Sequence, residues 1–72
     1  MKEIVINTET IKLDQFLKWA GIVETGGKGK RLIQTGKIRV NGEIEKKRGS
    51  ELTAGDIVEV IDSGEKYRVR VD

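Results

Sequence analysis

The sequence predicts an α+β fold in which a two-helix, helix-turn-helix-like corner packs on a small, mostly antiparallel sheet. Apolar residues recur at helical spacing only between about residues 13 and 35, and they alternate with polar residues in short runs before and after that stretch. The 72 residues contain no proline, repeat or low-complexity tract. We therefore expect one domain over residues 1–72.

A strand and a helix are predicted first. Residues 3–7 place Ile4 and Ile6 on one face by alternation, and a polar turn follows at residues 8–10. An amphipathic helix is predicted next, and Gly21 ends it. Its apolar face consists of Leu13, Phe16, Leu17 and Ala20.

A second helix is expected to begin after Thr25 as N-cap and to reach about Thr35, where Gly36 stops it. Ile22 and Val23 should pack in the corner between the two helices. Gly29, Leu32 and Ile33 would face inward, and Lys30, Arg31 and Gln34 outward.

Two hairpins complete the predicted sheet. Asn41-Gly42 is a strong turn sequence, and a three-residue loop, Val40-Asn41-Gly42, would pair Ile38 with Ile44, Arg39 with Glu43 and Lys37 with Glu45. In the last hairpin, a two-residue Ser63-Gly64 loop would join strands 57–61 and 67–71. That loop would pair Val60 with Tyr67, Val58 with Val69 and Glu59 with Arg68.

Composition excludes several function classes. The chain has neither cysteine nor histidine, so the usual thiol nucleophile, imidazole base and zinc ligands are missing. Carboxylates form no recognisable spaced pair, and we expect no enzymatic activity, metal or cofactor. No apolar run is long enough to span a bilayer, which predicts a soluble, cytoplasmic monomer without membrane contact.

The net charge of +2 is unevenly distributed along the chain. Residues 28–48 contain eight basic and two acidic residues, a net charge of +6, whereas the other 51 residues carry −4. Cations presented together release counterions from a nucleic-acid backbone and so supply affinity. This distribution predicts a basic RNA-binding face.

Glycines and cations coincide at the start of the second helix. Gly26 and Gly27 leave backbone N–H groups uncovered, and Lys28, Lys30 and Arg31 add charge, so the segment could hold a phosphate. The alternative is that the glycines only permit close helix packing and the cations are a solvated face. A nucleotide P-loop does not fit, because Gly27 stands where that motif needs lysine.

Aromatic residues are scarce. Phe16 and Tyr67 fall on core-facing positions, while Trp19 lies off the helical stripe and its role stays open. This scarcity favours recognition of a structured RNA by shape and backbone over stacking on single strands.

The chain resembles the S4-like, or alpha-L, RNA-binding domain over nearly its whole length. The resemblance is carried by residues 26–33 and 36–42, by Arg48-Gly49, by Leu52 and by Gly55-Asp56. The size of the chain and residues 13–18 look like the small stand-alone bacterial members of the YaaA/YbcJ type. Thr25, Gly29 and Lys12 depart from it, where serine, alanine and a serine or threonine cap are common. The resemblance implies two helices on a curved sheet, with RNA bound by the second helix and the following hairpin.

The sequence therefore predicts an RNA-binding module for structured RNA, ribosomal or transfer RNA, acting in ribosome assembly or translation quality control and associating with the ribosome. An adaptor that uses the same basic face on an acidic protein remains the alternative. The predicted RNA-binding residues are Gly26, Gly27, Lys28, Lys30, Arg31, Lys37, Arg39, Asn41, Lys46, Lys47 and Arg48.

Overall fold

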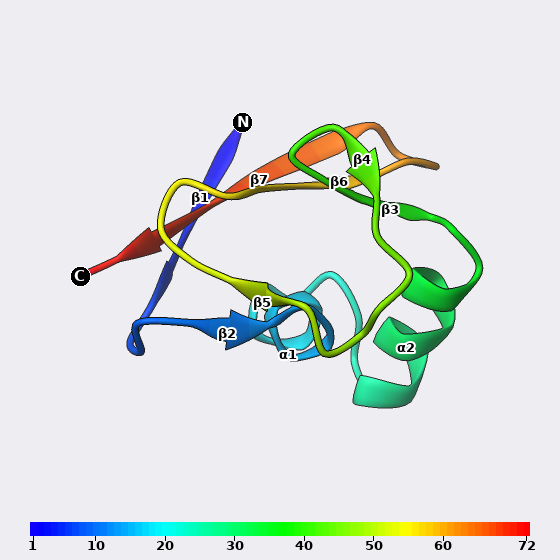
Figure 1. Cartoon of the computed structure of the whole chain (residues 1–72), viewed down its shortest axis with the longest axis horizontal. Helices are drawn as coiled ribbons and strands as arrows, with labels where there is room; N and C mark the ends of the chain where they lie inside the picture. Colours follow the sequence, from blue (N-terminus) through cyan, green and yellow to red (C-terminus); the bar gives the residue numbers. More distant parts are fainter.

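Two helices lie beside a five-stranded sheet in the computed structural model, which describes residues 1–72 (Figure 1). The sheet order is β1-β7-β6-β3-β4, and all neighbours are antiparallel except β1 and β7. This confirms the predicted α+β class. The strands are β1 (Lys2–Ile6), β2 (Ile11–Lys12), β3 (Ile38–Val40), β4 (Glu43–Ile44), β5 (Glu51–Leu52), β6 (Ile57–Val60) and β7 (Glu65–Val71).

Helix α1 (Leu13–Trp19) forms where the apolar stripe predicts it, and Leu13, Phe16 and Leu17 are buried. Lys12 gives its N-terminus no side-chain cap. Instead, the N–H groups of Leu13 and Asp14 donate to the carbonyls of Ser50 and Arg48, at 2.8 and 3.1 Å. A distant loop thus satisfies donors that a capping side chain would otherwise meet.

Helix α2 (Gly26–Gln34) begins after Thr25, as predicted, and the Thr25 Oγ1 accepts a hydrogen bond from the N–H of Lys28 at 3.2 Å. Gly29 and Ile33 are buried against α1 and the sheet. A Cβ on Gly29 would lie 3.4 Å from the carbonyl oxygen of Asp14, so this glycine marks the close approach of the helices. Gly36, with φ +75°, follows the helix end.

The register of the first hairpin differs from the prediction. Val40 pairs with Glu43 and Arg39 with Ile44, so the loop is the two residues Asn41-Gly42. Both have positive φ, +52° and +86°, as a type I′ turn requires. The predicted three-residue loop assumed that β4 has a face to bury, but both β4 residues are exposed.

The last hairpin is also shifted, by two residues. Val58 pairs with Tyr67 and Val60 with Glu65, so residues 61–64 form the loop rather than Ser63-Gly64 alone. The N–H of Gly64 donates to the carbonyl of Val60 at 2.8 Å and closes this wider turn. A shift of two residues leaves every side chain on its predicted face, so alternation could not detect it.

The core lies between the helices and the inner face of the sheet. Phe16 and Tyr67 belong to it, as predicted, and Ile22 and Val23 are half-buried against it at the corner. The sequence did not predict the short β2–β5 pair, which joins the start of α1 to the segment after the first hairpin. Neither helix is long and apolar enough to cross a membrane.

Candidate nucleic-acid interface

The first turn of α2 presents open backbone donors. The N–H groups of Gly26 and Gly27 have no hydrogen-bond acceptor, and no heavy atom lies within 4 Å of the position that a Cβ on Gly26 would occupy. Close helix packing is therefore the role of Gly29, whereas Gly26 and Gly27 leave the helix start uncovered. This geometry is suited to an anion approaching the positive end of the helix.

The cations of α2 differ in their partners. Lys28 forms an exposed ion pair with Glu24, with the Nζ and Oε2 atoms 3.6 Å apart. Lys30 and Arg31 are exposed and have no carboxylate within ion-pair distance. Their charge is therefore available to an external anion.

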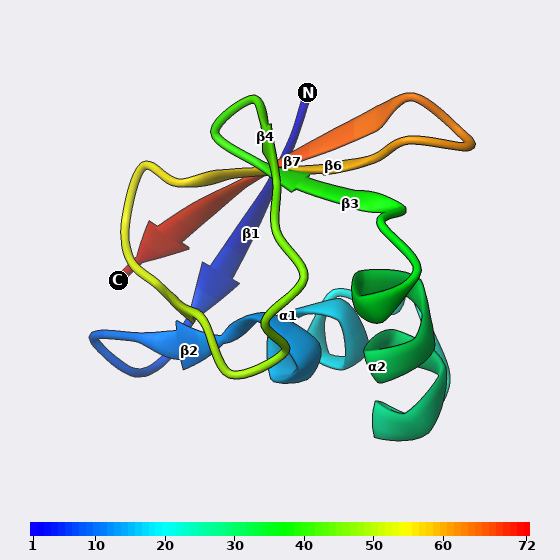
Figure 2. The same cartoon turned by 45° about the vertical axis from the view of Figure 1, so that its right-hand side comes forward.

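A second run of cations lies on the loop that leaves β4. This loop runs past α2 to the start of α1 in both views (Figures 1 and 2). The Cε of Lys46 lies 3.6 Å from the Cβ position of Gly36, and the carbonyl of Arg48 accepts the N–H of Asp14. Folding thus brings this run beside the second helix, although the two lie far apart in the sequence.

Glu45 holds the loop in shape. Its Oε1 accepts the N–H of Lys47 at 3.0 Å, and its Oε2 accepts the hydroxyl of Ser50 at 3.4 Å. The prediction that Glu45 faces Lys37 is wrong, because the hairpin register moves the two apart. Glu45 forms no ion pair with its neighbours, and Lys46, Lys47 and Arg48 have no acidic partner within ion-pair distance.

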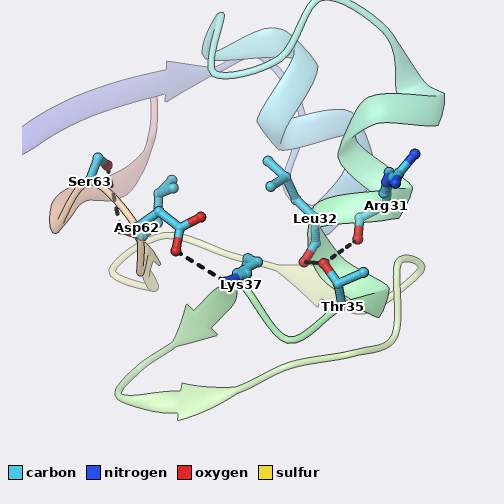
Figure 3. Close-up of polar contacts among 7 residues, drawn as sticks. Arg31, Leu32, Thr35, Lys37, Asp62 and Ser63 are labelled. Atoms are coloured by element: carbon cyan, nitrogen blue, oxygen red, sulfur yellow. Dashed lines mark hydrogen bonds and ion pairs between the residues drawn. The ribbon is translucent and has the colours of Figure 1, made fainter.

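Two cations of the predicted site, Lys37 just before β3 and Arg39 on it, form ion pairs with acidic residues of this chain. Lys37 Nζ lies 3.2 Å from Asp62 Oδ1 (Figure 3), and Arg39 Nη1 lies 3.5 Å from Glu59 Oε1. The amide of Asn41 donates to Asp56 at 3.0 Å and accepts the N–H of Ile57 at 2.9 Å. These three residues have structural contacts here, and their predicted contact with RNA stays a prediction.

Five of the eight predicted cations therefore form what we call the free-cation surface. It consists of Lys30 and Arg31 from α2 and Lys46, Lys47 and Arg48 from the following loop. The charge available to a ligand is smaller than the +6 counted along the chain, and it is concentrated beside α2.

Three residues have contacts that the sequence did not predict. Those of Glu45 and Asp62 are created by the loop geometry. Trp19 is 55% exposed, and its indole Nε1 donates to the carbonyl of Val5 at 2.9 Å. Its position off the helical stripe was the only sequence sign of this exposure.

Comparison with known proteins identifies the class. The S4 domain family model matches residues 4–70, so the chain belongs to the S4 domain family, as the resemblance predicted. A probable ribosome maturation protein, RlbA of Bacillus subtilis (strain 168), is 42% identical over 57 residues, covering 79% of this chain and 80% of the relative.

A solved structure shares the fold. The 30S ribosomal protein S4e from Thermoplasma acidophilum superposes with a TM-score of 0.63 over 86% of this chain, at 18% identity. The match spans 32% of the ribosomal protein's own length, so this chain corresponds to about a third of it. At this identity the similarity is one of fold.

Proposed function

We propose that the protein binds structured RNA, ribosomal or transfer RNA, through the free-cation surface and the open start of α2, and that it catalyses no reaction. One observation carries the proposal: five cations, two on α2 and three on the loop that runs past it to α1, have no acidic partner within ion-pair distance. Charges left unpaired by the fold are the ones that can displace counterions from a phosphate backbone.

Family membership and the relative support an RNA-binding role in ribosome-related function. The name of the Bacillus relative refers to ribosome maturation, and we propose the same setting, ribosome assembly, for this chain. Recognition would rest on shape and backbone contacts, because two of the three aromatic residues are in the core.

Salt titration tests the proposal. Fluorescently labelled transfer RNA and a labelled ribosomal RNA fragment are titrated with protein at several salt concentrations, and anisotropy is recorded. With about five phosphate contacts, log affinity should fall with log salt at a slope of roughly −3 to −5. A flat response for both RNAs would contradict phosphate binding.

A matched pair of variants locates the site. Lys30→Gln/Arg31→Gln should lower affinity and flatten the slope by roughly 1.5, because two contacts are lost. Lys66→Gln/Arg68→Gln removes the same charge from exposed, unpaired positions on β7 and should change little. Equal losses in the two variants would show that net charge alone, and not this surface, drives binding.

A further inference from the structure

A small groove lies between α2 and the turn that joins β6 to β7. One face of the helix lines it with residues at helical spacing, together with Val23 of the corner, Lys37 before β3 and Asp62 of the turn. Figure 3 shows Arg31, Leu32 and Thr35 on the helix, with Lys37 and Asp62 facing each other. Its volume is about 360 Å³, at the lower end of the range of about 300–1,000 Å³ for small-ligand sites. The lining residues are Val23, Lys28, Arg31, Leu32, Thr35, Lys37 and Asp62.

The lining combines two apolar residues with four charged ones. The apolar residues, Val23 and Leu32, are half-buried. The hydroxyl of Thr35 already donates to the carbonyls of Arg31 and Leu32, at 2.7 and 3.3 Å, so it offers no free donor. Such a lining suits a flat ring with apolar faces and a polar edge that is linked to an anionic group, which is the chemistry of a nucleotide.

Asp62 is the feature that a phosphate site alone would not need. Asp62 lines the groove together with three cations, and its carboxylate would repel a phosphate. Only its Oδ1 is engaged, by Lys37, in an ion pair whose side chains are 44% and 64% exposed. An exposed pair of this kind contributes little to stability, so Lys37 can exchange it for a phosphate.

We propose that this groove holds one unpaired guanine nucleotide of a bound RNA and that Asp62 reads the base. A carboxylate only accepts hydrogen bonds, and guanine presents two adjacent donors, N1–H and the N2 amino group, that would match its two oxygens. Uracil has no such pair. The ring would lie over Val23 and Leu32, while Lys28, Arg31 and Lys37 bind the flanking phosphates.

This inference rests on the proposed function and adds base specificity to it. In a duplex, the guanine donors are used in base pairing, so only a loop or bulge nucleotide can be read in this way. The groove lies beside Arg31 of the free-cation surface, so an RNA held there by its backbone can place such a nucleotide in it.

Nuclear magnetic resonance with mononucleotides tests the groove directly. Guanosine, inosine and uridine monophosphates are titrated into ¹⁵N-labelled protein, and amide shifts are followed. We expect guanosine monophosphate to shift the amides of Leu32, Thr35 and Lys37 and to bind at least fivefold more tightly than uridine monophosphate. Inosine monophosphate, which lacks the N2 amino group, should fall between them.

Asp62→Asn separates base reading from simple electrostatics. The variant should bind guanosine monophosphate more weakly and uridine monophosphate equally or more tightly, because a repulsive charge and a paired acceptor are lost together. Glu9→Gln, an equal charge change at an exposed and unpaired residue, should alter neither. If Asp62→Asn strengthens both nucleotides alike, base reading by Asp62 is wrong.

The outcomes for the two proposals are distinct. If structured RNA binds with the expected salt slope but the mononucleotides leave the groove amides unmoved, or bind without base preference, the guanine site is overturned and the RNA-binding proposal stands. If neither RNA binds, both proposals fail, whatever the mononucleotides do.

Discussion

The cations beside α2 and those on the sheet are the same residue types in opposite electrostatic situations. On the sheet, Lys2, Arg39 and Arg70 are each paired with a carboxylate, and Lys66 and Arg68 lie directly across from Glu59 and Glu3 in the strand register. On α2 and the loop after β4, Lys28 is paired with Glu24, and the other five cations have no such partner.

The difference shows in which elements a charge counted along the sequence predicts a charge that is unpaired in the fold. A strand residue takes its neighbours from distant parts of the chain, so Glu59, an acid outside the basic segment, pairs with Arg39 of β3. The neighbours of a helix residue are largely local. Unpaired charge therefore survives on α2 and its flanking loop, and the sheet face carries interleaved signs.

The largest effect is expected when two double variants are compared for RNA affinity. Lys47→Gln/Arg48→Gln removes two free cations and should lower RNA affinity roughly tenfold or more near 0.1 M salt. Lys2→Gln/Arg70→Gln removes one lysine and one arginine that are already paired, and it should change affinity much less. Anisotropy titrations with the same RNA measure both. Equal losses would mean that pairing does not decide which cations act.

Stability of α2 gives the next largest effect. Thr25→Ala removes the acceptor for the N–H of Lys28 and should destabilise the protein by about 1 kcal/mol. In a domain of this size that lowers the melting temperature by roughly 4–8 °C. Thr25→Ser keeps the acceptor and serves as the control in thermal unfolding followed by circular dichroism. If serine melts as early as alanine, the hydroxyl does not cap the helix.

Elements with strong local sequence patterns were predictable, and pairings between distant segments were not. Thr25 and Gly36 mark the observed ends of α2, and the stripe from Leu13 marks α1. The last hairpin was misplaced by two residues because that shift keeps Val58 and Tyr67 facing inward. Both hairpin turns were recognised, but their registers depend on backbone conformation that residue patterns specify only weakly.

In the candidate site, too, contiguous features were predictable from the sequence and contacts between distant residues were not. The sequence indicated the basic segment and the glycines at the start of α2, because both are contiguous. Asp62 could not be linked to Lys37 without the fold, since 25 residues separate them. The pairing of Arg39 with Glu59 likewise follows from the β3–β6 register.

Removing the acidic partner of a paired cation should raise RNA affinity, by a smaller factor than the loss of free cations lowers it. Glu59→Gln removes the partner of Arg39 and should raise RNA affinity about two- to threefold, if Arg39 reaches the RNA as predicted, because one further cation becomes available. Glu51→Gln, an exposed and unpaired acid, controls for the change in net charge. If the two variants behave alike, Arg39 makes no contact of its own.

The smallest expected effect is a pH dependence of stability confined to the sheet. The Tyr67 hydroxyl donates to Glu65 at 2.7 Å; together with the charge of Lys2 this lowers the pKa of Glu65 below 4.5. The same hydrogen bond, with burial, raises the pKa of Tyr67 above 10.0. Stability from Glu65 is thus present above pH 4.5 and lost as pH falls through the lowered value.

Tyr67 acts at the other end of the pH range. Its contribution is complete below pH 10.0 and is lost as pH rises through the raised pKa. Tyr67→Phe should therefore reduce the change in melting temperature both below pH 4.5 and above pH 10, relative to the unmodified protein. Glu65→Gln keeps the hydroxyl but should reduce the acid change as well, because the titrating carboxyl is gone. An unchanged acid response in Tyr67→Phe would show that the hydrogen bond does not control Glu65.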